Sequence, residues 1–83
     1  MPRGTEAARW EALQLSRMRG MVQGRTVRTI RERSGLSLKE VADACGVTPS
    51  CVHYWEKGEH LPQGEPAVRY ARLLFDLEDL TRR

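Results

Sequence analysis

Residues 37 to 57 read SLKEVADACGVTPSCVHYWEK, and this stretch contains the start and stop signals of two short helices. Ser37 can cap the first helix, and Glu40 at the third helical position completes a capping box. Gly46 ends that helix, because a residue that tolerates a positive φ closes it at low cost. Thr48 then caps a second helix, whose first position is a proline without an N–H to satisfy. The stretch therefore predicts a helix, a three-residue turn and a second helix.

The apolar spacing gives each of these helices one inward face. Val41, Ala42 and Cys45 share a face of the first helix. Val52 and Trp55 share a face of the second. The opposite side of the second helix carries polar donors and one positive charge, on Ser50, His53, Tyr54 and Lys57. A helix that presents such groups beside a tight turn is the form that enters the major groove of DNA.

Further residues on both sides of the two helices complete a recognisable pattern of fixed spacings. They are Val27, Ile30, Arg31, Gly35, Leu36, Glu56, Gly58 and Pro62. With them, the run from Gly24 to Leu77 resembles the helix-turn-helix domain of the phage repressor and Cro family, which is also widespread among bacterial regulators. This run covers roughly two-thirds of the chain. The resemblance implies an all-α fold, a small bundle of about five helices with a lambda-repressor-like DNA-binding domain.

The resemblance also implies which residues contact DNA. It assigns base reading to Pro49, Ser50 and Tyr54, and phosphate contacts to Ser37, Leu38 and Thr48. The family often has glutamine where Leu38 and Pro49 stand, and neither of these side chains can form a bidentate hydrogen bond with a base. Direct reading would then depend on Ser50, His53, Tyr54 and Lys57. In the following loop, His60 becomes a candidate for contact with the DNA backbone or minor groove.

Positive charge is concentrated toward the N-terminus. Residues 1 to 33 hold eight arginines and three glutamates, a balance of +5, whereas residues 34 to 57 and 58 to 83 each come to −1. Arg25 and Arg28 fall on the outward side of a helix predicted in this region, where they could contact phosphates. A solvated, arginine-rich helix is the alternative explanation.

Arg31 has a different predicted role. In the resembling family, the arginine at this position pairs with the glutamate of a Trp-Glu-x-Gly motif, here Glu56, and ties the first helix of the domain to the recognition helix. A planar guanidinium suits this role because it can bind a carboxylate through two parallel hydrogen bonds. An exposed arginine without this partner is the alternative.

Residues 1 to 23 lie outside the resemblance. Thr5 can cap a helix from about residue 6 to residue 19, which Gly20 would end. Its apolar residues form two stripes, one of Ala7, Trp10, Leu13, Met18 and Met21 and one of Ala8, Ala12, Leu15 and Val22. Two stripes need two partners, so the helix could pack on its own domain, form a dimer contact or act as a basic arm on DNA. The expected division is an N-terminal helical extension over residues 1–20, a DNA-binding domain over residues 21–77 and a tail over residues 78–83.

The C-terminal part predicts a loop and one long helix. Leu61 is expected to enter the core and Pro62 to form a rigid turn, and the helix is expected to start at Glu65 and Pro66. Its predicted core face is Val68, Ala71, Leu74 and Phe75. A further apolar edge of Leu73, Leu77 and Leu80 could form a dimer seam or simply end the helix.

Size and composition narrow the class of protein. A chain of 83 residues and 9.5 kDa forms one domain, with no room for a cleft between subdomains. No catalytic motif is present, so we expect no enzyme, no cofactor and no small-molecule ligand. The chain has neither a long apolar run nor a leader, which favours a cytoplasmic protein without a membrane span. Cys45 and Cys51 are expected to be reduced thiols, because a zinc site built from them with His53 and His60 would lack the usual spacing.

These features predict a sequence-specific transcriptional regulator of double-stranded DNA, a Cro-like or small phage or bacterial repressor that inserts residues 48–57 into the major groove of its operator. A homodimer, in free solution or formed only on DNA, would supply the specificity that one helix lacks. The alternative is an antitoxin-like or adaptor-like protein-interaction module, which uses the same fold without reading DNA. The absence of glutamine at Leu38 and Pro49 favours that alternative.

Overall fold

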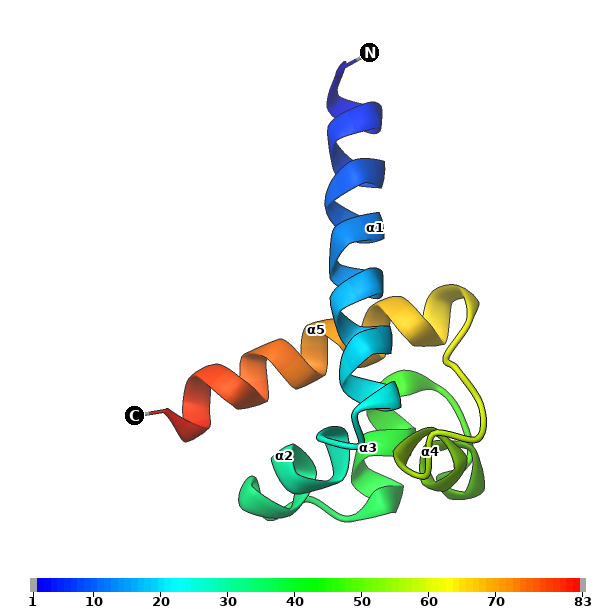
Figure 1. The fold of residues 1–83 in the computed structure, drawn as a ribbon, viewed down its shortest axis with the longest axis vertical. Helices are drawn as coiled ribbons and strands as arrows, with labels where there is room; N and C mark the ends of the chain where they lie inside the picture. Colours follow the sequence, from blue (N-terminus) through cyan, green and yellow to red (C-terminus); the bar gives the residue numbers. More distant parts are fainter. Residues whose placement is uncertain (1, 83) are drawn as a thin grey trace.

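The computed structural model describes residues 2–82, with side chains from Thr5 onward, and these residues form five helices and no strand. The helices are α1 (Pro2–Gln23), α2 (Val27–Arg33), α3 (Leu38–Cys45), α4 (Pro49–Glu56) and α5 (Gly64–Thr81) (Figure 1). The predicted all-α fold with a helix-turn-helix is confirmed. None of the described helices is both long enough and apolar enough to cross a membrane.

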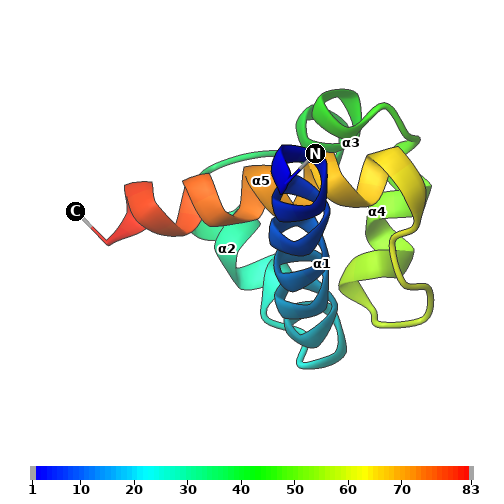
Figure 2. The same cartoon turned by 90° about the horizontal axis from the view of Figure 1, so that it is seen from above.

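The helices α2, α3 and α4 gather at one end of the molecule, and α5 passes across them (Figures 1 and 2). The first helix crosses α5 and projects beyond it, so its N-terminus lies at the opposite end from α4 (Figure 1). The buried core consists of Met18, Val22, Val27, Val41, Ala42, Cys45, Val52, Trp55, Ala67, Tyr70, Ala71, Leu74 and Leu77. Every helix contributes to this core, so the second half of α1 belongs to the folded domain.

Local sequence signals set the ends of α3 and the start of α4 as predicted. The Glu40 backbone N–H donates to Ser37 Oγ at 3.0 Å, and the Ser37 N–H donates to Glu40 Oε1 at 2.9 Å. Gly46 ends α3 with a φ of 75°, in the left-handed region. The Cys51 N–H donates to Thr48 Oγ1 at 3.2 Å and so caps α4. These caps fix the turn between the two helices, and the turn sets the direction of α4.

The prediction that Gly20 ends the first helix was wrong, since α1 continues to Gln23. Val22 lies in the last turn and is fully buried, and its burial outweighs the roughly 1 kcal/mol that a glycine inside a helix costs. The chain turns instead at Arg25, whose φ is 60°. The helix also starts before Thr5, which is therefore not its cap. The expected boundary at residue 20 thus falls inside a helix.

One expectation about the C-terminal part was wrong, and one of the open alternatives for Leu77 is narrowed. Leu61 is exposed, and the following Pro62 is the loop residue that is buried. Leu77 is only 7% exposed and belongs to the core, so it is not free to form a dimer seam. The core face of α5 is centred on Tyr70, whose ring centroid lies 4.6 Å from that of Trp55. This helix also continues through most of the expected tail.

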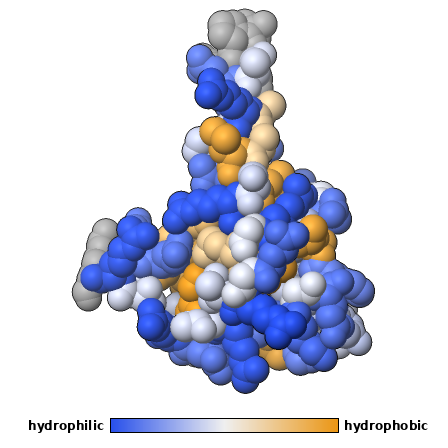
Figure 3. Space-filling model, viewed as in Figure 1, coloured by the Kyte–Doolittle hydropathy of each residue, from blue (hydrophilic) through white to orange (hydrophobic). Residues whose placement is uncertain are grey.

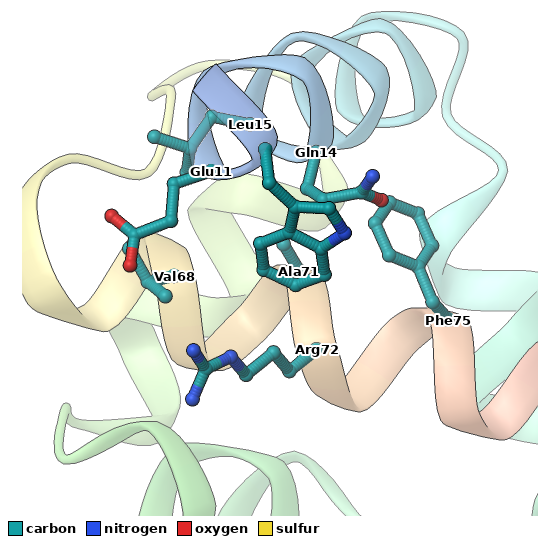
Figure 4. A pocket seen from close by; sticks show the side chains of 8 residues that line it. Glu11, Gln14, Leu15, Val68, Ala71, Arg72 and Phe75 are labelled. Atoms are coloured by element: carbon teal, nitrogen blue, oxygen red, sulfur yellow. The ribbon is translucent and has the colours of Figure 1, made fainter. Parts of the chain in front are cut away.

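A small pocket marks the crossing of α1 and α5. Val68 and Phe75, which were expected in the core, are half-buried and line this pocket together with Leu15 (Figure 4). Trp10 also lines it, and the guanidinium carbon of Arg72 lies 5.8 Å from the centroid of its ring. Trp10 therefore packs against α5, although 48% of its surface remains exposed.

Candidate nucleic-acid interface

The helix α4 has a buried side and a free side. Val52 and Trp55 are buried in the core. The candidate residues on and beside this helix, Thr48, Pro49, Ser50, His53, Tyr54 and Lys57, are all exposed. The helix therefore presents donors, acceptors and one cation to solvent along its length. The major groove of B-DNA, about 12 Å wide, admits a helix of this kind.

Ser37 and Thr48 stand at the N-termini of α3 and α4. Their hydroxyl oxygens accept backbone hydrogen bonds in the caps, and each hydroxyl can still donate its proton to a phosphate oxygen. The positive end of each helix dipole also favours an anion there. Leu38, which follows Ser37, is half-buried and packs against the core, so only part of its side chain can reach a partner.

An ion pair joins α2 to α4. Arg31 Nη2 donates to Glu56 Oε1 at 3.0 Å, and Arg31 Nε donates to the other carboxylate oxygen. A third hydrogen bond runs from Arg31 Nη1 to the carbonyl of Leu36 at 3.0 Å. The two charged side chains are 13% and 5% exposed. The hydrogen bond with Glu56 raises the pKa of Arg31 above its ordinary value, although desolvation acts in the opposite direction. The pair fixes the position of α4 relative to α2.

Two adjoining hollows lie beside the free side of α4, and we call them together the basic hollow. The first, of about 260 Å³, is lined by Arg28, Arg31, Leu38, His53, Glu56 and Lys57. The second, of about 280 Å³, is lined by Arg25, Arg28, Glu56, Lys57 and Glu59. Arg28 and Lys57 line both, and each has an exposed acidic partner, Glu32 at 3.4 Å and Glu59 at 3.3 Å respectively. Exposed ion pairs contribute only about 0–1 kcal/mol to stability, so a phosphate could replace either glutamate as the partner of the cation.

His60, the candidate in the loop after α4, is exposed and lies beside Tyr54, with 5.1 Å between the two ring centroids. The ring of His53 lies 5.9 Å from that of the same Tyr54. Helical spacing places His53 and Tyr54 on the free side of α4, but it does not predict that His60 contacts Tyr54. Gly58 was the available signal, because a glycine stop folds the next residues back onto the last turn of a helix.

The described residues contain no cluster of three or more histidine, cysteine, aspartate or glutamate side chains suited to a metal ion. Cys45 and Cys51 are free thiols, the first buried and the second half-buried. Burial raises the pKa of Cys45 to about 11, so this thiol stays protonated at neutral pH. The exposed chemistry beside α4 consists of hydrogen-bonding groups and cations, together with the carboxylates of Glu32 and Glu59 that pair with two of these cations.

A capped turn followed by an exposed polar helix, with cations along its flank, defines a protein of the helix-turn-helix class. A family model described as a helix-turn-helix domain matches residues 24–82, and the chain belongs to this family of DNA-binding domains. The helix α1 precedes the matched residues. No curated protein and no solved structure matches the chain.

Proposed function

We propose that the protein is a sequence-specific transcriptional regulator that binds double-stranded DNA by placing α4 in the major groove. The observation that carries this proposal is the free side of α4 next to the basic hollow. Base edges require donors and acceptors inside the groove, and the flanking phosphates require cations beside it. His53 and Lys57 belong to both surfaces, so one approach of the duplex would engage the two together.

Each candidate residue has a role in this proposal. Base edges are assigned to Ser50, His53, Tyr54 and Lys57. Phosphates are assigned to Arg25, Arg28, Ser37 and Thr48. Leu38 and Pro49 offer apolar surface, which suits contact with the methyl group of thymine rather than a bidentate hydrogen bond. His60 would lie at the edge of the contact, beside Tyr54, and is assigned to neither a base nor a phosphate.

The finer proposal is a small repressor of the Cro type that acts in the cytoplasm. A module bound in the groove excludes other proteins from the same DNA, which is sufficient for repression. One recognition helix reads few base pairs, so the proposal includes two copies on a pseudo-palindromic operator.

The first experiment is a fluorescence anisotropy titration with a random duplex at several salt concentrations. We expect the affinity to fall steeply with salt, because binding releases counterions from the phosphates. Arg28→Ala is expected to reduce the salt slope by about 0.9, the contribution of one phosphate contact. Arg9→Ala on the projecting half of α1 removes the same charge and is the matched control, expected to leave the slope unchanged. Binding that does not depend on salt would contradict the proposal.

The second experiment selects bound sequences from a random duplex pool and repeats the titration on the selected duplex. Ser50→Ala is expected to cost about 1–3 kcal/mol on the selected duplex and little on the random one. Arg28→Ala should weaken both duplexes alike, because phosphate contacts carry no sequence information. Equal losses of affinity for Ser50→Ala on both duplexes would show that Ser50 contacts a phosphate and not a base.

A protein-interaction module is the second candidate function. Leu38 and Pro49 favour it, because neither can read a base by paired hydrogen bonds. The projecting half of α1 also favours it, since Trp10 and Leu13 are 48% and 57% exposed there. Under this alternative the wild-type protein would show no steep salt dependence with either duplex, so the same titrations separate the two functions.

A further inference from the structure

The ring of Tyr54 contacts two histidine rings. Its centroid lies 5.9 Å from that of His53, the preceding residue on α4, and 5.1 Å from that of His60, in the loop between α4 and α5. The ring planes are inclined by 55° and 38° respectively. Both distances fall within the range of about 4.5–7 Å over which aromatic pairs attract each other. We call these three residues the ring triad.

The backbone holds the loop that carries His60 against α4. Gly58 has a φ of 73°, and its N–H donates to the carbonyl of Trp55 at 3.0 Å. The N–H of Glu59 donates to the carbonyl of Tyr54 at 3.1 Å, and the N–H of His60 reaches the same oxygen at 3.5 Å. The first two bonds form the Schellman motif that ends many helices. The position of His60 therefore follows from the way in which α4 ends.

The far end of the same loop is also fixed. Pro62 is fully buried, and its carbonyl accepts a hydrogen bond from Arg19 Nη2 of α1 at 3.3 Å. With both ends held, few backbone conformations are left to the residues between them. The ring of His60 is thus kept beside Tyr54 although both side chains are exposed.

We propose that His60 is a positioning residue for Tyr54, and that the ring triad reads DNA as one preorganised unit. This inference rests on the proposed function. An exposed tyrosine can adopt several rotamers, and a hydrogen bond from its hydroxyl to a base requires one of them. Neighbouring rings restrict that choice before binding, so less side-chain entropy is lost when the phenol enters the groove. His60 acts through Tyr54 and needs no base contact of its own.

A double-mutant cycle on the selected and random duplexes tests this role. We expect His60→Ala to weaken binding to the selected duplex about fivefold, with less than about a twofold change on the random duplex. In the Tyr54→Ala background, the same change should have less than about a twofold effect, because no ring is left to position. His60→Phe keeps a ring without a proton donor and should bind within about twofold of the wild type. Gln63→Ala, in the same loop, is the matched control and should leave both affinities unchanged.

Three results in this cycle would overturn the positioning role. Equal losses for His60→Ala on both duplexes would make His60 a phosphate contact. A His60→Phe variant as weak as His60→Ala would show that the imidazole itself contacts DNA. An undiminished effect of His60→Ala in the Tyr54→Ala background would show that the two residues act independently.

NMR of the free protein separates this inference from the proposed function. The Hα–Hβ couplings of Tyr54 report whether its side chain occupies one rotamer or several. We expect one rotamer in the wild type and in His60→Phe, and averaging in His60→Ala. A single rotamer retained in His60→Ala would overturn the positioning role even if DNA binding is established. Absence of salt-dependent binding by the wild type would instead refute the proposed function, while the couplings would still decide whether His60 positions Tyr54.

Discussion

The ion pair of Arg31 and Glu56 stands at the edge of the core, where charges are costly to leave without a partner. Glu56→Ala would leave the guanidinium, 13% exposed, without its carboxylate. We expect the free energy of unfolding to fall by about 2–4 kcal/mol, because removing one partner leaves the other charge partly desolvated. Urea denaturation measures this change, and DNA affinity should fall with it because the pair positions α4.

Lys39→Ala is the matched control, because it breaks an exposed pair with Asp43 whose side chains are 75% and 63% exposed. That change should lower the free energy of unfolding far less than Glu56→Ala does, because solvent screens an exposed pair. Equal effects of Glu56→Ala and Lys39→Ala would show that the buried pair contributes no more than a surface pair.

We expect two core side chains to make the stability of the fold sensitive to alkaline pH. Burial raises the pKa of Cys45 from 9.0 to about 11 and raises the pKa of Tyr70 above its ordinary value of 10.0. Both groups are neutral when protonated, so the unfolded chain loses these protons at a lower pH than the folded protein. The stability they contribute is therefore fully present below about pH 9 and decreases as the pH rises toward 11. Urea denaturation between pH 7 and 11 is the measurement.

Variants of the two tyrosines show which side chain causes this pH dependence of the stability. Tyr70→Phe should remove part of it, because the variant has no buried phenol to ionise. Tyr54→Phe alters an exposed phenol and should leave it unchanged. A stability that stays constant up to pH 11 would contradict the burial of both Cys45 and Tyr70.

At the scale of the element, two glycines have open surroundings, so alanine substitutions there test the effect of backbone conformation on stability without a change in packing. Gly20 lies inside α1 and Gly35 follows α2 with a φ of 72°, and a Cβ at either position would meet no atom within 4 Å. Gly20→Ala should raise the free energy of unfolding by about 0.5–1 kcal/mol, because alanine favours the helix. Gly35→Ala should lower it by about 1–2 kcal/mol, because alanine is strained at positive φ. In thermal melts, a loss of stability in Gly20→Ala would contradict the helical conformation of Gly20, and a gain in Gly35→Ala would contradict the positive φ of Gly35.

The elements differ in how far sequence could predict them. The ends of α3 depend on side chains three residues apart, such as Ser37 and Glu40, so their signals are local and the prediction succeeded. The end of α1 depends on burial of Val22 by other helices, and this tertiary gain overrides the local preference of Gly20. The burial of Leu77 likewise depends on how α5 crosses the other helices, which periodicity alone does not determine.

At the candidate interface, too, features set by local sequence could be predicted and features set by the packing of helices could not. The free side of α4 could be predicted because Val52 and Trp55 define the opposite side by helical periodicity. The basic hollow could not, because it requires the relative placement of α2 and α4. The contact of His60 with Tyr54 depends on the path of a loop, for which periodicity gives no information.

At the scale of the whole molecule, α4 and the start of α1 occupy opposite ends (Figure 1). Between residues 5 and 13 nearly every side chain is exposed, and Figure 3 shows hydrophobic surface along this projecting part. The large apolar side chains exposed there are Trp10 and Leu13, and Leu80 near the end of α5 is 63% exposed. A protein contact at the projecting half of α1 would leave α4 and the basic hollow free for DNA. This placement favours a dimer contact over a basic arm on DNA.

The proposed operator contact requires two copies of the chain. A module that reads a few base pairs cannot select one site among about a million competing genomic sites. A two-fold pair with recognition helices about 34 Å apart would read twice as many. The exposed apolar surface around Leu13 is small, so we expect pairing mainly on DNA, where adjacent half-sites raise the effective concentration of one copy for the other.

Substitutions at Leu13 and Leu80 test which surface forms the contact between the two copies. On a palindromic duplex, Leu13→Glu should abolish cooperative binding, because a buried carboxylate opposes the contact between copies. The half-site affinity should stay within about twofold of the wild type, because Leu13 lies far from α4. Leu80→Glu makes the same chemical change on α5 and should leave cooperativity intact, and the reverse pattern would place the seam on α5. Sedimentation with the duplex should show two copies bound at saturation. One copy per palindromic duplex at saturation would contradict the dimer, and so would two copies bound without cooperativity, because in either case the chain binds DNA as a monomer.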